Sequence, residues 1–131
     1  MKRKFDITNA TVLLVDDDQF LRGMYATKFA AHGAHVEVAG NSEEALERLR
    51  GGLVPALIIF DLVMPGIDGY GFIESVMSEK LAQGATKIAL SNQSSEEEVV
   101  RALNLGADGH LTKANATPSE TVDSILEMAA K

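Results

Sequence analysis

The sequence contains no cysteine, and proline occurs only 3 times in 131 residues. Without cysteine, the chain has no disulfide scaffold, no thiol nucleophile and no cysteine-based zinc or iron–sulfur site. Basic residues are also scarce, since 12 lysines and arginines stand against 19 acidic residues and leave a net charge of -7. Such a chain repels phosphate backbones, so we expect no direct contact with nucleic acid.

Long apolar segments are missing as well. The longest apolar runs, Val12 to Val15 and Ala56 to Phe60, are far shorter than the roughly 18 to 20 residues that span a bilayer. The basic start at Lys2, Arg3 and Lys4 is not followed by the apolar stretch of a signal peptide. We therefore expect a soluble, cytoplasmic protein without membrane insertion.

The length predicts one domain. A chain of this size buries roughly 68 to 70 per cent of the surface that its unfolded form exposes, which suffices for a core without metal or disulfide staples. No stretch rich in proline, glycine or serine marks a linker, and no segment is repeated. We expect a single domain over residues 1–131, with its core at about residues 10–130 and no effector domain.

Five short segments predict strands. The runs Val12 to Val15 and Ala56 to Phe60 are continuous rather than alternating, which is typical of parallel strands covered on both faces. Ile88 to Leu90 is similar, whereas His35 to Ala39 alternates and carries a charge, as expected at a sheet edge. The mixed segment His110 to Thr112 predicts a second edge strand.

Segments with helical spacing of apolar residues follow these strands. The apolar positions are Leu21, Tyr25 and Phe29; Ala45, Leu46 and Leu49; Phe72, Ile73, Val76 and Met77; Val99, Val100 and Leu103; and Val122, Ile125, Leu126 and Ala129. Capping-box patterns predict helix starts at Asn41 to Glu44, Ser95 to Glu98 and Thr117 to Glu120. Glycines predict helix ends at Gly33, at Gly51 with Gly52, and at Gly106.

Five strands that alternate with five helices predict an α/β fold with a doubly wound, five-stranded parallel sheet. Right-handed crossovers and two edge strands give the flavodoxin-like strand order 2-1-3-4-5. Ligand sites of this class lie beyond the carboxyl ends of the strands, near the switch point between the first and third strands.

Acidic residues follow both of those strands. Asp16, Asp17 and Asp18 come directly after the first strand, and Asp61 directly after the third. Carboxylates that meet in one crevice repel one another unless a cation joins them, and oxygen ligands alone suit Mg²⁺ or Mn²⁺. We expect Asp18 to cap the following helix instead, because Asp is a common N-cap residue.

The segment after the third strand carries a specific pattern, Asp61-Leu62-Val63-Met64-Pro65-Gly66-Ile67-Asp68-Gly69. It resembles the phosphoacceptor segment of response-regulator receiver domains, in which Asp is followed by two variable residues, Met-Pro, two more, and Asp-Gly. The likeness covers nearly the whole chain. It implies that Asp61 is phosphorylated, that Asp17 and Asp61 bind Mg²⁺, and that Val63 adds its backbone carbonyl.

The same resemblance assigns the other ends of strands. Asp16 would bind the ion directly or through water. Ser91, after the fourth strand, is similar to the hydroxyl residue that hydrogen-bonds the phosphoryl group, and Lys113, after the fifth, to the lysine that pairs with it. Phosphoryl transfer depends on positioning and on neutralising the charge of the transferring oxygens, which explains why a carboxylate, a cation and a lysine occur together.

Two positions depart from the family pattern. Most receivers have proline after the lysine of the fifth strand, whereas Ala114 follows Lys113 here. A cis bond before a residue other than proline costs about 2.5 to 4 kcal/mol, so we expect a trans peptide. His110 occupies the place of the usual switch aromatic, three residues before the lysine, where it either takes part in switching or is a passive edge-strand residue.

The resemblance implies a phosphoacceptor protein in two-component signalling or a phosphorelay, rather than an enzyme beyond self-phosphorylation from small donors and autodephosphorylation. The donor would be a sensor histidine kinase or a histidine phosphotransfer protein. Phosphorylation would alter the face made by the fourth helix, fifth strand and fifth helix, which then binds a downstream protein target. The chain would be a monomer or a phosphorylation-dependent dimer.

Two alternatives remain open at this point. Asp16 with Asp18 forms an Asp-x-Asp pair like that of haloacid-dehalogenase-like phosphatases, with Asp16 as nucleophile and Asp18 as acid or base. Phe20 breaks that pattern, because Thr or Val is usual there, and no cap segment is evident. The other alternative is a degenerate, non-phosphorylated receiver that acts only as an interaction module.

Overall fold

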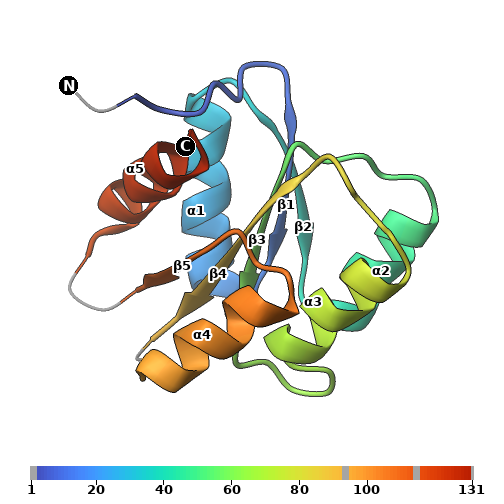
Figure 1. The fold of residues 1–131 in the computed structure, drawn as a ribbon. Coiled ribbons are helices and arrows are strands. Elements are labelled where there is room, and N and C mark those ends of the chain that lie inside the picture. Colours follow the sequence, from blue (N-terminus) through green and yellow to red (C-terminus); the bar gives the residue numbers. More distant parts are fainter. Residues whose placement is uncertain (1–2, 93–94, 114–115, 131) are drawn as a thin grey trace.

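Five parallel strands form the centre of the molecule, in the order β2-β1-β3-β4-β5 (Figure 1). The computed structural model describes residues 3–92, 95–113 and 116–130. The strands are β1 (Thr11–Val15), β2 (His35–Ala39), β3 (Leu57–Asp61), β4 (Thr86–Ser91) and β5 (Gly109–Thr112). The predicted fold class, strand order and edge strands are confirmed.

Helices cover both faces of the sheet. They are α1 (Gln19–Ala31), α2 (Ser42–Arg50), α3 (Gly69–Ser78), α4 (Glu96–Leu105) and α5 (Pro118–Ala129). Helices α1 and α5 lie on one face, and α2, α3 and α4 on the other (Figure 1). None of the helices in the described parts combines the length and the apolar character needed to cross a bilayer.

The continuous apolar runs are explained by these two layers. In β1, Leu13 and Val15 belong to the core beneath α2 and α3, while Val12 and Leu14 belong to the core beneath α1 and α5. Every residue of β3 is buried. Full burial of one such aliphatic side chain contributes about 1.5 to 3 kcal/mol, so β1 and β3 contribute strongly to the stability of the fold.

Two of the three predicted capping boxes are present, at Ser95 with Glu98 and at Thr117 with Glu120. The third prediction is only half correct. Asn41 accepts the N–H of Glu44, but the Glu44 carboxylate accepts the N–H of Gly40 instead of that of Asn41. A side chain one turn into a helix reaches either backbone donor, so sequence spacing alone does not distinguish them.

The third strand lies one residue later than its apolar run predicts. It ends at Asp61, which pairs with Leu90 of β4, and the N–H of Leu62 continues the ladder by donating to the Leu90 carbonyl. The phosphoacceptor candidate is therefore a strand residue held by backbone pairing, rather than the first residue of a loop.

Gly69, the first residue of α3, lies against the main chain that follows this strand. A Cβ atom there would lie 2.6 Å from Leu62 Cα and even closer to the Asp61 carbonyl oxygen. We expect Gly69→Ala to lower the free energy of unfolding by about 1 to 3 kcal/mol, because backbone atoms must shift to admit the methyl group. Urea denaturation measures the loss; Gly84→Ala, where nothing lies within 4 Å, is the control and should change it little.

Candidate functional site

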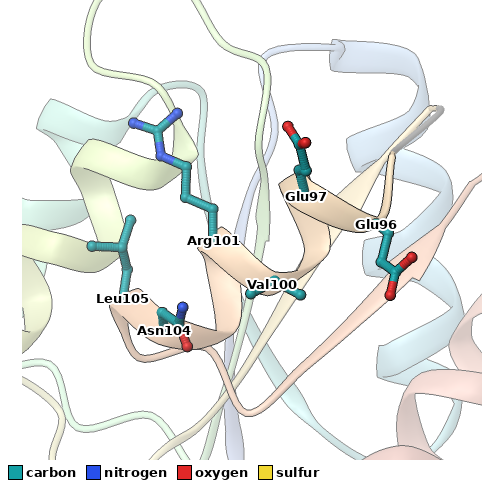
Figure 2. Close-up of a pocket in the computed structure, with 6 residues that line it drawn as sticks. All are labelled: Glu96, Glu97, Val100, Arg101, Asn104 and Leu105. Atoms are coloured by element: carbon teal, nitrogen blue, oxygen red, sulfur yellow. The ribbon is translucent and has the colours of Figure 1, made fainter.

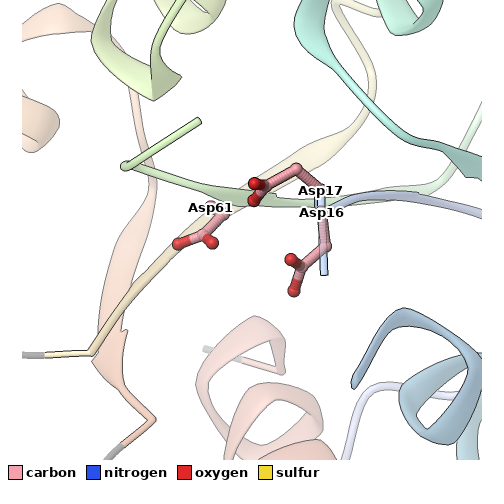
Figure 3. A group of neighbouring side chains, drawn as sticks. All are labelled: Asp16, Asp17 and Asp61. Atoms are coloured by element: carbon pink, nitrogen blue, oxygen red, sulfur yellow. The ribbon is translucent and has the colours of Figure 1, made fainter. Parts of the chain in front are cut away.

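Three carboxylates meet at the carboxyl ends of β1 and β3. Each of Asp16, Asp17 and Asp61 offers one oxygen, and these oxygens all lie within 4.8 Å of one another. Figure 3 shows the three side chains turned toward a common space. Asp16 and Asp61 are buried, whereas Asp17 is exposed and leaves the cluster open to solvent.

Asp16 is fixed by bonds to its side chain and its main chain. One carboxylate oxygen accepts the N–H of Asp18 at 2.9 Å, and the guanidinium of Arg22 donates to the Asp16 carbonyl oxygen at 2.9 Å. This role of Arg22 is not predicted by the sequence, where the only signal is a basic residue one turn into the helix that follows the acidic run. Asp18 accepts the N–H of Leu21 and caps α1, as predicted.

The segment between β3 and α3 is held at both ends. The hydroxyl of Ser42 donates to the Ile67 carbonyl at 2.8 Å, and the N–H of Gly69 donates to the Leu62 carbonyl at 2.9 Å. Asp68 caps α3 by accepting the N–H of Gly71, which gives this residue a structural role. The main chain at Val63, whose side chain is exposed, therefore lies in a fixed loop beside Asp61.

Lys113 joins the two buried acids. Its Nζ donates to Asp16 Oδ2 and to Asp61 Oδ2, each at 3.1 Å, and its own N–H donates to the Ser91 carbonyl at 2.7 Å. The contacts tie the residue after β5 to the ends of β1, β3 and β4. The expected peptide bond from Lys113 to Ala114 lies outside the described residues.

The charges at this site do not balance. Burial raises the pKa of Asp61, Lys113 partly opposes the rise, and the neighbouring Asp16 and Asp17 add to it. Burial alone would lower the pKa of the Lys113 ammonium, but Asp61 and Asp16 outweigh burial and raise it. One ammonium therefore faces three carboxylates, and such a surplus of oxygen donors fits a hard divalent cation.

A second polar contact lies beside the acids. Ser91 is buried at the end of β4, and a hydrogen bond of 2.9 Å joins its Oγ to His110 Nε2 on β5. Burial lowers the pKa of His110, and the Glu98 carboxylate of α4 partly offsets that effect. The structure thus places the predicted residues Asp16, Asp17, Asp61, Ser91 and Lys113 at the carboxyl ends of the strands, with His110 two residues before the end of β5.

Comparison with known proteins identifies the family. The model of the response regulator receiver domain matches residues 12–125. The chain belongs to this family. Receiver domains act in two-component signalling, so the predicted family and its general role are confirmed.

Individual relatives agree with this assignment. The chain is 35% identical over 123 residues to the nitrate/nitrite response regulator protein NarL of Escherichia coli, covering 92% of this chain and 55% of NarL. It therefore spans little more than half of that relative. It is 32% identical to chemotaxis protein CheY of Halobacterium salinarum, with coverage of 89% and 94%.

Solved structures show the same architecture. The receiver domain of a putative response regulator NarL from Mycobacterium tuberculosis has a TM-score of 0.78 at 28% identity, with coverage of 94% of this chain and 98% of that chain. CheY4 of Vibrio cholerae has a TM-score of 0.82 at 27% identity, with coverage of 92% and 99%.

The charge imbalance generates a prediction for stability. Because the pKa of Asp61 is raised in the folded protein, folding favours its protonated form, and the stability that this form contributes is lost as pH rises from the ordinary value for Asp through the folded pKa. We expect Asp61→Asn to raise the melting temperature at pH 7. The gain should shrink as pH falls and vanish below about 3.9, the ordinary value for Asp, where both states are protonated.

Thermal melts of both proteins from pH 3 to pH 8 measure this difference. Glu74→Gln is the control, because Glu74 is an exposed residue of α3 and lies outside the acidic cluster. An Asp61→Asn variant that is less stable than the wild type at pH 7 would contradict the prediction.

Proposed function

We propose that this receiver domain accepts a phosphoryl group on Asp61. The observation that carries the proposal is the pair of 3.1 Å contacts from Lys113 Nζ to Asp61 and Asp16. These contacts place a buried ammonium beside the Asp61 carboxylate, which also lies close to Asp16 and Asp17. The Lys113 ammonium can therefore pair with the dianionic phosphoryl group once that group is attached to Asp61.

In the proposed reaction, an Asp61 carboxylate oxygen attacks phosphorus. An O–P bond forms, and the bond from phosphorus to the histidine nitrogen or acyl oxygen of the donor breaks, its electron pair leaving with the donor. The Lys113 ammonium, already hydrogen-bonded to Asp61, pairs with a phosphoryl oxygen. The hydroxyl of Ser91, the last residue of the adjacent strand, donates to another.

The three carboxylates are the proposed Mg²⁺ ligands. Asp17 and Asp61 would bind the ion directly with the Val63 carbonyl, and Asp16 directly or through water; Mn²⁺ has the same ligand preferences. The bound ion supplies charge neutralisation at the transferring oxygens. The donor set fits, because it consists of oxygen atoms alone and Asp17 keeps it accessible to solvent.

The proposed output surface consists of α4, β5 and α5. On α4, Arg101 lies over the Tyr70 ring, 4.0 Å from its centroid, which anchors one side of the helix to α3. Its outer side carries the exposed apolar residues Val100 and Leu103. A shallow pocket on this helix is lined by the residues drawn in Figure 2: Glu96, Glu97, Val100, Arg101, Asn104 and Leu105.

The proposed partners follow from this surface and from the family. A sensor histidine kinase or histidine phosphotransfer protein supplies the phosphoryl group, and a downstream protein binds the altered α4, β5 and α5 face. We propose a cytoplasmic protein that is a monomer or a phosphorylation-dependent dimer, with neither nucleic-acid binding nor membrane insertion. Its own catalytic capacity is limited to self-phosphorylation and autodephosphorylation.

The phosphatase alternative receives no support from the site. Its acid or base would be Asp18, but that carboxylate accepts the N–H of Leu21 and caps α1. Its nucleophile would be Asp16, which is 1% exposed and whose carboxylate accepts the N–H of Asp18 in addition to the Lys113 contact that it shares with Asp61. Asp61 has a more open position beside the exposed Asp17.

Phosphorylation is tested with a small acyl phosphate. After incubation with the donor and Mg²⁺, intact-mass measurement and peptide mapping should find one phosphoryl group on Asp61. Asp61→Ala should abolish the adduct, whereas Asp18→Asn, which retains a good N-cap residue, should keep it. An adduct on Asp16 would support the phosphatase, and no adduct together with no binding of a phosphoryl analogue would support the interaction module.

Cation binding is tested separately. We expect Mg²⁺ to raise the free energy of unfolding by about 1.4 kcal/mol at ten times its dissociation constant, because the ion binds the folded acids and not the unfolded chain. Asp17→Asn should weaken this response at least tenfold in concentration without loss of the fold, since Asp17 is exposed. Thermal melts over a Mg²⁺ series provide the measurement, and Asp18→Asn is again the control; an unchanged response in Asp17→Asn would remove Asp17 from the site.

A further inference from the structure

His110 contacts the serine that the proposed function assigns to the phosphoryl group. The register pairs His110 with Ala89, and Ser91 lies two residues further along β4 on the same face. The imidazole therefore reaches Ser91 diagonally across two neighbouring strands. The resulting hydrogen bond of 2.9 Å is partly buried, so water competes weakly for either group.

The serine hydroxyl has one proton. It can donate that proton to a single acceptor, either a ring nitrogen of histidine or a phosphoryl oxygen. Burial favours the neutral imidazole by lowering the pKa of His110, and a neutral imidazole has one nitrogen that accepts. When Nε2 is that nitrogen, the Ser91 hydroxyl donates its proton to His110 in the unphosphorylated protein.

We propose that His110 Nε2 and a phosphoryl oxygen on Asp61 compete for the hydroxyl proton of Ser91, so that His110 is a positioning residue that opposes phosphorylation. This inference rests on the proposed function, because it presumes that Asp61 carries the group. Phosphorylation then requires the Ser91–His110 bond to break, and the imidazole is freed at the same moment.

The freed imidazole also interacts electrostatically with α4, because the Glu98 carboxylate of its first turn opposes the lowering of the His110 pKa. Glu98, whose carboxylate acts on His110 through space, also accepts the N–H of Ser95 in the capping box of that helix. His110 therefore interacts with Ser91 through a hydrogen bond and with Glu98 of the first turn of α4 through its charge. Release of the histidine changes the surroundings of a residue that stabilises the end of the proposed output helix.

A double-mutant cycle with beryllofluoride, a stable phosphoryl analogue, tests the competition. The dissociation constant is measured by NMR titration with Mg²⁺ for the wild type, His110→Phe, Ser91→Ala and the double variant. His110→Phe should bind about 2- to 10-fold more tightly than the wild type, the range expected for one hydrogen bond lost from the free state. In the Ser91→Ala background, His110→Phe should have no effect, because no hydroxyl remains to be released.

His110→Gln is the conservative variant, since its amide oxygen offers an acceptor on a side chain of similar reach. Its dissociation constant should stay within about twofold of the wild-type value. Equal dissociation constants in wild type and His110→Phe would overturn the inference. So would an equal effect of His110→Phe with and without Ser91, since the aromatic ring would then act by packing.

The ¹⁵N spectrum of the His110 ring provides a signature that packing does not imitate. Nε2 should resonate as a hydrogen-bonded acceptor nitrogen in the free protein and shift when beryllofluoride binds. A proton on Nε2 in the free protein, or a ring spectrum that beryllofluoride leaves unchanged, would overturn the inference. Failure of the proposed function is recognised separately, because the wild type would then bind no beryllofluoride even with Mg²⁺.

Discussion

The contact of Lys113 with Asp16 and Asp61 is the interaction on which the rest of the site depends. Three strands end in these residues or just before them, and the ammonium holds their carboxyl ends together across the sheet. The contact is also incomplete as a charge pair, because one cation faces three acids. The same lysine therefore holds the carboxyl ends of the strands together and leaves the site with more negative than positive charge.

Much of this arrangement could be predicted from the sequence. Continuous apolar runs identified β1 and β3 as central strands, and the alternation in β2 identified an edge, which together gave the strand order. In a parallel sheet, the residues that follow the strands all lie at the same edge, and those that follow neighbouring strands lie close together. The acids were assigned to one site for this reason, whereas Ser91 and Lys113 were assigned to it by the resemblance to receiver domains.

What could not be predicted depends on side-chain direction. Nothing in the sequence shows that Arg22 turns back to the carbonyl of Asp16, or that Glu44 caps Gly40 instead of Asn41. The bond between His110 and Ser91 depends on strand register to the single residue, which apolar patterns define only to within one or two positions.

The place of each strand in the sheet gives the site two mechanically different halves. Asp16 and Asp17 follow β1 and Asp61 ends β3, two strands that are paired on both sides and have buried side chains on both faces. Lys113 and His110 belong to the β5 edge, which is paired on one side only and opens at a lower free energy than the centre. The half that holds the carboxylates is thus the more constrained one, and the half that holds Lys113 and His110 is the less constrained one. Local opening of β5 would withdraw Lys113 from both carboxylates while the strands that lead to Asp16 and Asp61 stay paired.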